Sequence, residues 1–195
     1  MEMLFVPVLA YLIGSFSSAY VVGRVFKKID IRNHGSGNAG ATNALRIMGS
    51  KLGVLTFFMD FAKGIVAVLV GTGLGGYTGG MIAALFAVLG HNWPIFFKFK
   101  GGKGIATTIA AMAILQFPIT LLSVVVGVLT AAISRYVSLG SLVFLTVLFA
   151  LSFTGMSDGG SITSIITFVL MVLGYYRHKG NIKRLIEGTE NKIGR

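Results

Sequence analysis

The sequence predicts an all-α integral membrane protein with seven transmembrane helices, one of them short, an external N-terminus and a cytoplasmic C-terminus. Three observations support this fold class. Of the 195 residues, 54% are hydrophobic and only 12% are charged, and the mean hydropathy is +0.83. Apolar runs recur along the whole chain, and the basic residues fall between alternate runs. This composition excludes a soluble globular domain, a disordered chain and a coiled coil.

The apolar runs define the expected spans in chain order. A bilayer core about 30 Å thick takes about 20 apolar residues per helix. The runs cover residues 4–23, 52–72, 78–97, 104–116, 117–134, 138–155 and 161–176, and we expect one polytopic membrane domain over residues 1–195. The fourth run is short, and one helix over 104–134, kinked at Pro118, would give six spans instead.

The positions of the basic residues decide between seven spans and six. Of the 17 Lys and Arg residues, all except Lys63 lie in residues 24–51, in residues 98–103, at position 135 or in the tail 177–195. Seven spans place these segments on one face, whereas six would move Arg135 and the tail to the other face. Because basic loops stay cytoplasmic, the sequence predicts seven spans.

Two features inside the membrane part are predicted to be structural. The first run follows Glu2 without a basic segment before it, so we expect a retained span and not a cleaved signal. Asp60 and Lys63 stand three residues apart in the second run, the spacing of neighbours on one helix face. An ion pair between them would neutralise two charges inside the bilayer.

A first polar cluster covers residues 30–46 on the basic face. Gly35, Gly37 and Gly40 allow backbone N–H groups to converge on an anion. Thr42 or Asn43 is expected to cap a helix that continues through Arg46, and a helix N-terminus favours phosphate. A flexible loop would contain similar glycines. The polar residues interleaved with them favour anion binding, and they are Ser36, Asn38, Thr42, Asn43 and Arg46.

A second cluster begins at Gly90-His91 and ends at Gly101-Gly102-Lys103-Gly104. A lysine inside a glycine run, directly before a helix, suits phosphate binding. Because Gly104 stands where a Walker A loop has Ser or Thr, ATP hydrolysis is disfavoured. The helix that follows is too short to cross a bilayer alone, so we expect it to begin below the membrane surface.

A third cluster follows the last span. His178 and Asn181 lie three residues apart and can share a helix face, although Gly180 between them can break the helix. Ser138 and Ser141, at the start of the sixth span, are expected to cap that helix or line a cavity. Asp158, in a glycine-rich connection, is expected to be a solvated turn residue.

The sequence lacks the residues that several kinds of catalytic or metal site require. The chain has no cysteine and three histidines, and no histidine–carboxylate cluster suits a metal, so we expect no metal and no cofactor. There is no Gly-x-Ser-x-Gly nucleophile motif. Topology already accounts for the positive charge, which argues against nucleic-acid binding. A small membrane transporter for an organic or inorganic phosphate anion remains the alternative to an enzyme.

Together the three clusters resemble the PlsY family, the acyl-phosphate:glycerol-3-phosphate acyltransferases of bacterial membranes. The resemblance covers nearly the whole chain. The first motif is matched by Asp30-Ile31-Arg32, Gly35-Ser36-Gly37-Asn38, Gly40-Ala41-Thr42-Asn43 and Arg46. The second is matched by Gly90-His91, Pro94, Phe96 and residues 99–104, and the third by His178, Asn181, Arg184, Gly188 and Glu190.

The resemblance implies a reaction in which an acyl group passes from acyl phosphate to the 1-hydroxyl of glycerol-3-phosphate, giving lysophosphatidic acid for phospholipid synthesis. It implies a multi-pass protein of the bacterial inner membrane, with the site on the cytoplasmic side, membrane lipid around it and no obligate protein partner. The proton acceptor is either His178 or the phosphate of the acyl phosphate.

The resemblance also implies roles for individual residues. The expected catalytic residues are Ser36, Arg46, Lys103, His178 and Asn181. The expected substrate-binding residues are Gly35, Gly37, Asn38, Gly40, Thr42, Asn43, His91, Gly101, Gly102 and Ser141. Glu190, like Asp60 and Lys63, is expected to be structural.

Overall fold

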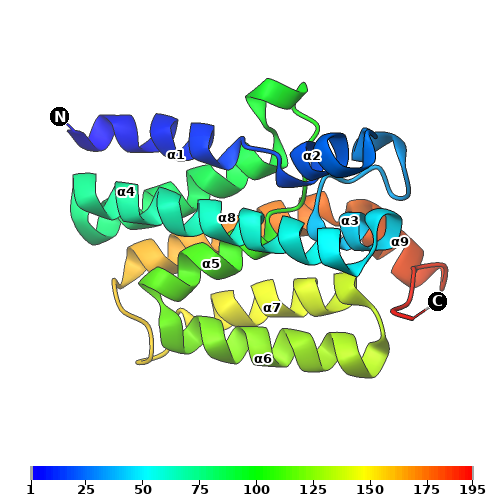
Figure 1. The fold of residues 1–195 in the computed structure, drawn as a ribbon. Coiled ribbons are helices and arrows are strands. Elements are labelled where there is room, and N and C mark those ends of the chain that lie inside the picture. Colours follow the sequence, from blue (N-terminus) through cyan, green and yellow to red (C-terminus); the bar gives the residue numbers. More distant parts are fainter. Residues whose placement is uncertain (1, 195) are drawn as a thin grey trace. The chain divides into compact units, whose positions relative to one another are not determined.

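The computed structural model describes residues 2–194, and within that range the regular structure is helical (Figure 1). Met1 lies outside the described residues, as does Arg195, which belongs to the predicted basic tail. Contacts divide the chain into two compact units. The first ends at Leu115 and the second begins at Gln116.

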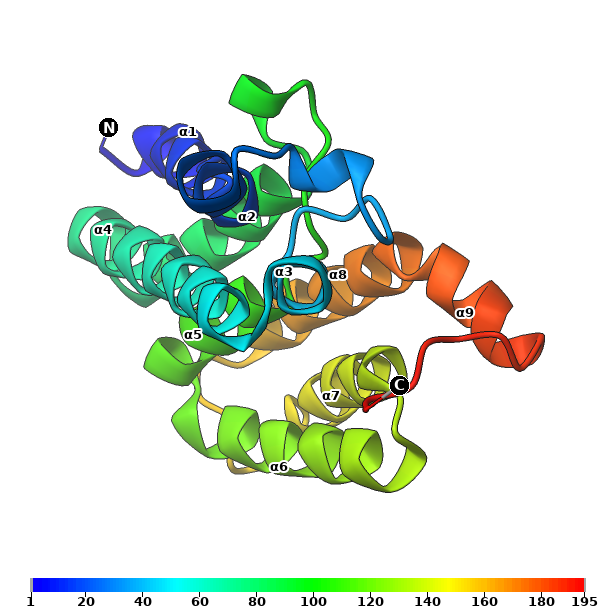
Figure 2. The same cartoon turned by 45° about the vertical axis from the view of Figure 1, so that its right-hand side comes forward.

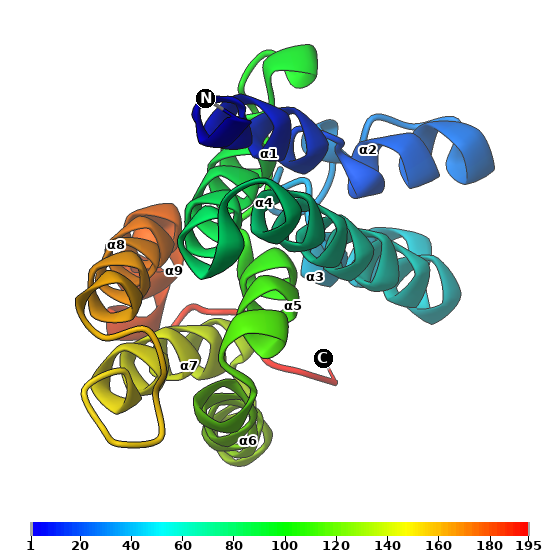
Figure 3. The same cartoon turned by 90° about the vertical axis from the view of Figure 1, so that its left-hand side faces the viewer.

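The first unit is built around one long element that folds back on itself. Its helices are α1 (Val6–Gly14), α2 (Ser18–Val22), α3 (Ala41–Met48), α4 (Ser50–Asn92) and α5 (Ile105–Leu115). Its short helical turns are η1 (Glu2–Phe5), η2 (Gly23–Lys27), η3 (Ile31–Asn33) and η4 (Ile95–Phe97). The α4 backbone leaves the helical region at Gly75 and Gly76, so α4 is a hairpin of two helices. Helices α1, α3 and α5 pack against it (Figure 3).

Small residues let the helices of the first unit approach closely. Gly71 and Gly79 face each other across the α4 hairpin, and a Cβ on Gly71 would overlap Ala83. A Cβ on Gly64 would lie only 2.7 Å from the Thr107 carbonyl oxygen on α5. Without a hydrophobic drive between helices in lipid, such close packing supplies much of the association energy.

The second unit contains α6 (Phe117–Ser134), α7 (Val137–Leu151), α8 (Ser161–Arg177) and α9 (Lys179–Ile186). Helices α6 and α7 lie side by side (Figure 2). Gly127 on α6 and Gly140 on α7 meet so closely that a Cβ on either would overlap the other's carbonyl. The buried Gln116 side chain connects the start of α6 to the segment between α7 and α8. Its Nε2 donates to the Asp158 carbonyl at 2.7 Å, and its Oε1 accepts from the Asp158 N–H at 3.1 Å.

The helix ends correct several predicted spans. The first span is interrupted between α1 and α2, at residues 15–17. The third predicted span stops at Asn92, because Pro94 has no N–H and displaces Trp93 from helical geometry (φ −134°, ψ 69°). The sixth ends at Leu151 and not at residue 155.

The join near Pro118 is a break between two helices. Gln116 is non-helical (φ −145°, ψ 56°), and Pro118 lies in the first turn of α6, where its missing N–H costs no intrahelical bond. Among the described residues, three helical stretches are long and apolar enough to cross a membrane by themselves: Glu2–Lys27, Ser50–Phe97 and Phe117–Ser134. Shorter apolar helices are Ile105–Leu115, Val137–Leu151 and Ser161–Arg177.

The α4 hairpin gives a stability prediction. In Gly71→Ala the new methyl group overlaps the facing helix, and overpacking of this kind costs about 1–3 kcal/mol. The matched control is Gly73→Ala, two residues away, where the ideal Cβ meets no atom within 4 Å. Thermal unfolding in detergent should show a lower midpoint for Gly71→Ala and an equal or higher midpoint for the control. Equal midpoints in both variants would contradict the close packing.

Candidate active site

The first glycine-rich loop is held by the buried side chain of Asn43. Its Oδ1 accepts from the Ser36 N–H at 3.1 Å, and its Nδ2 donates to the carbonyls of His34 at 3.0 Å and Ile31 at 3.4 Å. Gly35 has a φ of 60°, and a Cβ there would overlap Asn43 Oδ1. The buried Asn43 side chain therefore fixes the loop backbone by hydrogen bonds, while the Ser36 side chain stays exposed.

The expected helix caps in this loop are wrong. Helix α3 begins at Ala41, and Gly40 is its N-cap, with no side-chain cap bond. Thr42 and Asn43 lie inside the first turn, where Asn43 is engaged by the loop. Thr42 and Arg46 stand one turn apart on α3, and both are exposed.

The second glycine-rich loop is packed onto the end of α4. The Gly102 N–H donates to the His91 carbonyl at 3.0 Å. A Cβ on Gly101 would overlap that same carbonyl, and a Cβ on Gly102 would overlap the His91 imidazole. His91 is 6% exposed, so it lies under the loop as its support. The half-buried Lys103 follows, and α5 begins two residues later.

His91 belongs to a buried polar cluster centred on Asp60. Asp60 Oδ1 accepts from Lys63 Nζ at 2.9 Å and from Ser18 Oγ at 2.8 Å, and it lies 3.4 Å from His91 Nδ1. Lys63 Nζ also donates to the Phe16 carbonyl at 2.6 Å, in the break between α1 and α2. The predicted ion pair is present. Its contacts with Ser18 and His91 were not foreseen, because sequence spacing reveals neighbours only within one helix.

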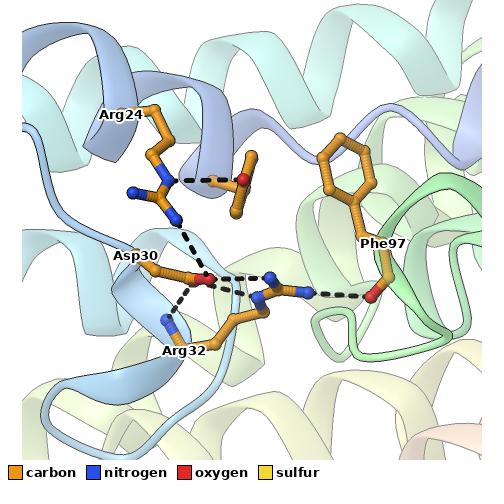
Figure 4. A network of polar contacts seen from close by, with 5 residues as sticks. Arg24, Asp30, Arg32 and Phe97 are labelled. Atoms are coloured by element: carbon orange, nitrogen blue, oxygen red, sulfur yellow. Dashed lines mark hydrogen bonds and ion pairs between the residues drawn. The ribbon is translucent and has the colours of Figure 1, made fainter.

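A second network, which was also missed, joins the segment before the first glycine-rich loop to the turn before the second (Figure 4). Arg32 forms a two-pronged pair with Asp30, with Nε to Oδ1 at 2.9 Å and Nη2 to Oδ2 at 2.7 Å. Its third nitrogen, Nη1, donates to the Phe97 carbonyl at 2.8 Å. The hydrogen bonds from Arg32 hold the pKa of Asp30 below its usual value. The Asp30-Ile31-Arg32 triplet is the sequence signal for this network, because it places a carboxylate and a guanidinium two residues apart.

The third cluster lies in the second unit and is organised by Glu190. Its carboxylate accepts from Ser138 Oγ at 3.0 Å, from Asn181 Nδ2 at 2.7 Å and from Arg184 Nε at 2.7 Å. Burial alone would raise the pKa of Glu190, but these hydrogen bonds outweigh it and the pKa is lowered. Asn181 is therefore fixed in place by a carboxylate nine residues away.

His178 closes α8 and is almost fully buried, with 2% exposed. Its Nδ1 lies 2.8 Å from the Gly174 carbonyl, which can only accept, so the ring carries a proton on Nδ1. Helix α9 runs through Gly180, so Gly180 does not break the helix between His178 and Asn181. Neither Ser138 nor Ser141 caps α7. Ser141 Oγ donates back to the Val137 carbonyl at 2.9 Å.

The structure thus brings the first two clusters together in one unit and places the third in the other. The family model for glycerol-3-phosphate acyltransferase matches residues 4–188. The chain belongs to this family. It is therefore an acyltransferase and an integral membrane protein, and the transporter alternative is set aside.

Relatives and solved structures agree with the family assignment. The glycerol-3-phosphate acyltransferase of Thermoanaerobacter pseudethanolicus is 44% identical over 187 residues, covering 96% of this chain and 93% of the relative. That of Halalkalibacterium halodurans is 45% identical over 192 residues, covering 95% and 93%. The crystal structure of PlsY (YgiH), an integral membrane glycerol 3-phosphate acyltransferase, in the glycerol 3-phosphate form superposes with a TM-score of 0.92. It shares 38% identity with this acyltransferase, covering 100% of this chain and 96% of that one.

The Asp60 cluster gives a prediction about stability. Asp60→Asn leaves the Lys63 ammonium buried without its counter-charge, and breaking a buried pair costs about 3–5 kcal/mol. We expect the unfolding midpoint in detergent to fall by about 10 °C. Glu187→Gln, at a half-exposed surface carboxylate, is the control and should leave the midpoint unchanged. A midpoint unchanged in Asp60→Asn would show that the pair is dispensable.

Glu190 gives a prediction about pH. Its folded-state pKa lies below the usual 4.5, so its stabilisation is fully present above about pH 4.5 and is lost as the pH falls through the folded pKa. Glu190→Gln should therefore lower stability at pH 7 and flatten the acid side of the stability profile. Glu187→Gln removes a half-exposed carboxylate 3.8 Å from Lys183 and should leave the profile as it is. Parallel acid profiles for wild type and Glu190→Gln would refute this assignment.

Proposed function

We propose that this acyltransferase transfers a fatty acyl group from acyl phosphate to the 1-hydroxyl of glycerol-3-phosphate. The hydroxyl oxygen bonds to the acyl carbonyl carbon, the bond from that carbon to the phosphate oxygen breaks, and the products are lysophosphatidic acid and inorganic phosphate. This reaction is the first step of phospholipid synthesis. The PlsY (YgiH) structures in the glycerol 3-phosphate and lysophosphatidic acid forms, 38% and 36% identical to this chain, support the acceptor and the product.

The observation that carries the proposal is the seating of the second glycine-rich loop. Gly101 and Gly102 are pressed against His91, and the loop leads directly into α5. A glycine loop with a lysine at a helix N-terminus lets a phosphate approach the backbone closely and offers it a cation, while the Gly102 N–H stays bonded to the His91 carbonyl. We assign Gly101, Gly102 and Lys103 to the phosphate of glycerol-3-phosphate, with His91 holding the loop from below.

The first loop and the third cluster supply the remaining roles. Acyl phosphate is an activated anhydride, so its carbonyl needs positioning and charge stabilisation more than a covalent intermediate. Ser36, or Asn181 held by Glu190, donates to the developing oxyanion. Arg46, with Thr42 one turn away on α3, neutralises phosphate. Ser141 has its hydroxyl bonded to the Val137 carbonyl, so its oxygen meets substrate only as an acceptor.

The proton of the attacking hydroxyl passes to the departing phosphate of the acyl phosphate. A carboxylate base is not required for this route. The alternative acceptor is His178, whose Nδ1 proton is committed to Gly174 and whose basic position would be Nε2. Because His178 is so deeply buried, its fixed ring favours an orienting role, and we retain the phosphate as the acceptor.

The membrane setting follows from the basic segments. We propose that both units form one membrane domain of seven spans in the bacterial inner membrane. Every basic segment, including both glycine-rich loops, then lies on the cytoplasmic side, where soluble phosphorylated substrates are found.

Product formation tests the proposal directly. Purified protein in lipid mesophase is given labelled glycerol-3-phosphate with palmitoyl phosphate, and in parallel with palmitoyl-CoA. We expect lysophosphatidic acid from the acyl phosphate alone. Product from the thioester would overturn the donor, and no product from either, in folded protein, would overturn the reaction.

Lys103→Ala tests the phosphate assignment. Losing one charge-assisted contact should lower kcat/KM for glycerol-3-phosphate about 10–100-fold. Lys51→Ala removes an exposed lysine at the start of α4 and is the matched control, expected to behave as wild type.

His178→Gln tests the proton acceptor. A His178→Gln protein that keeps most of its turnover would exclude histidine as the base.

A further inference from the structure

The turn that precedes the second glycine-rich loop adopts an unfavourable backbone conformation. Lys98 and Phe99 have φ values of 56° and 58°, in the left-handed region that residues with a Cβ avoid. The turn closes on itself, since the Pro94 carbonyl accepts from the N–H groups of Phe97 and Phe99 at 3.1 and 3.0 Å. Such a turn persists only where its surroundings hold it.

Most side chains of the turn cannot hold it. Ile95, Phe96 and Phe99 are 47%, 66% and 55% exposed, and Lys98 and Lys100 are exposed as well. Pro94 is buried, and Phe97 is half-buried and faces the rest of the unit. Its ring lies against Tyr20 with centroids 4.8 Å apart, and its carbonyl accepts from both Arg32 Nη1 and the Lys100 N–H, at 2.8 and 3.2 Å.

Arg32 uses each part of its guanidinium in this contact. Two nitrogens face the Asp30 carboxylate and the third faces the Phe97 carbonyl (Figure 4). The Arg32 Cζ atom lies over the Tyr20 ring, 4.8 Å from its centroid. The Asp30 and Arg32 side chains are only 12% and 18% exposed. A lysine cannot make these contacts together, because its ammonium is not a planar fork.

Arg32 also sits where it can couple two loops. It lies in η3, three residues before Gly35, and the Phe97 carbonyl lies four residues before Gly101. We propose that Arg32 is a positioning residue that fixes the Gly101–Lys103 loop relative to the first glycine-rich loop by holding the Phe97 carbonyl. This inference rests on the proposed function, in which that loop binds the phosphate of glycerol-3-phosphate.

Arg32→Lys tests the proposal, and Arg24→Lys is its matched control. Arg24 also lies over Tyr20, at 5.3 Å, and meets Asp30 at 3.8 Å, but the structure gives it no bond to Phe97. We expect Arg32→Lys to raise KM for glycerol-3-phosphate about tenfold, with little change in KM for acyl phosphate or in the unfolding midpoint. Arg24→Lys should match wild type in all three.

Hydrogen exchange provides a readout independent of turnover. Amides 97–103 should exchange faster in Arg32→Lys than in wild type or Arg24→Lys, and glycerol-3-phosphate should slow this exchange only at higher concentration. Unchanged exchange and unchanged KM would overturn the proposal. A parallel loss of kcat, of both affinities and of the midpoint would also overturn it, because Arg32 would then serve the fold as a whole.

Failure of the proposed function looks different. If wild type makes no lysophosphatidic acid, the reaction is wrong, yet faster exchange of amides 97–103 in Arg32→Lys would still support the contact's hold on the loop. Asp30→Asn gives a second test, because it weakens the fork while Arg32 keeps its donors. Its exchange at 97–103 should lie between wild type and Arg32→Lys, and exchange equal to wild type would count against the proposal.

Discussion

The arrangement of the first unit depends on keeping one carboxylate ionised and satisfied inside apolar surroundings. Asp60 is 2% exposed, and an isolated charge at that depth is costly. Its partners come from separate parts of the unit: Lys63 from its own helix, Ser18 from the start of α2 and His91 from the returning half of α4. The Asp60 carbonyl also accepts from Thr107 on α5 at 3.2 Å. The contacts that satisfy Asp60 therefore also place α2 and α5 and hold His91, which supports the second glycine-rich loop.

The break between α1 and α2 shows how this constraint reaches the backbone. An interrupted helix leaves carbonyl groups without partners, which lipid cannot satisfy. Lys63 donates to one of them, the Phe16 carbonyl, while it neutralises Asp60. A single ammonium thus makes both the buried carboxylate and the irregular backbone tolerable. The contact stabilises the break between two helices in an apolar run that reads as one span.

Sequence reasoning predicted the features that depend on local pattern. These are the helical class, the ion pair at Asp60 and Lys63 and the break near Pro118. It did not predict the roles of Asn43 and Arg32. Both act by donating to backbone carbonyls, Asn43 within its own loop and Arg32 across 65 residues of sequence. Backbone acceptors are the same at every position, so a sequence carries no mark of which carbonyl a side chain will meet.

The glycines of the two loops serve different physical needs, although the sequence presents them alike. Gly35 and Gly37 have positive φ values and shape a turn around Asn43. For Gly101 and Gly102 the deciding feature is the missing side chain, which lets the loop lie directly on His91. A loop seated in this way has its backbone placed before a ligand arrives, with the Gly102 N–H bonded to the His91 carbonyl. In the proposed reaction the acyl donor is already activated, so fixed donors and cations would supply the stabilisation that the transition state requires.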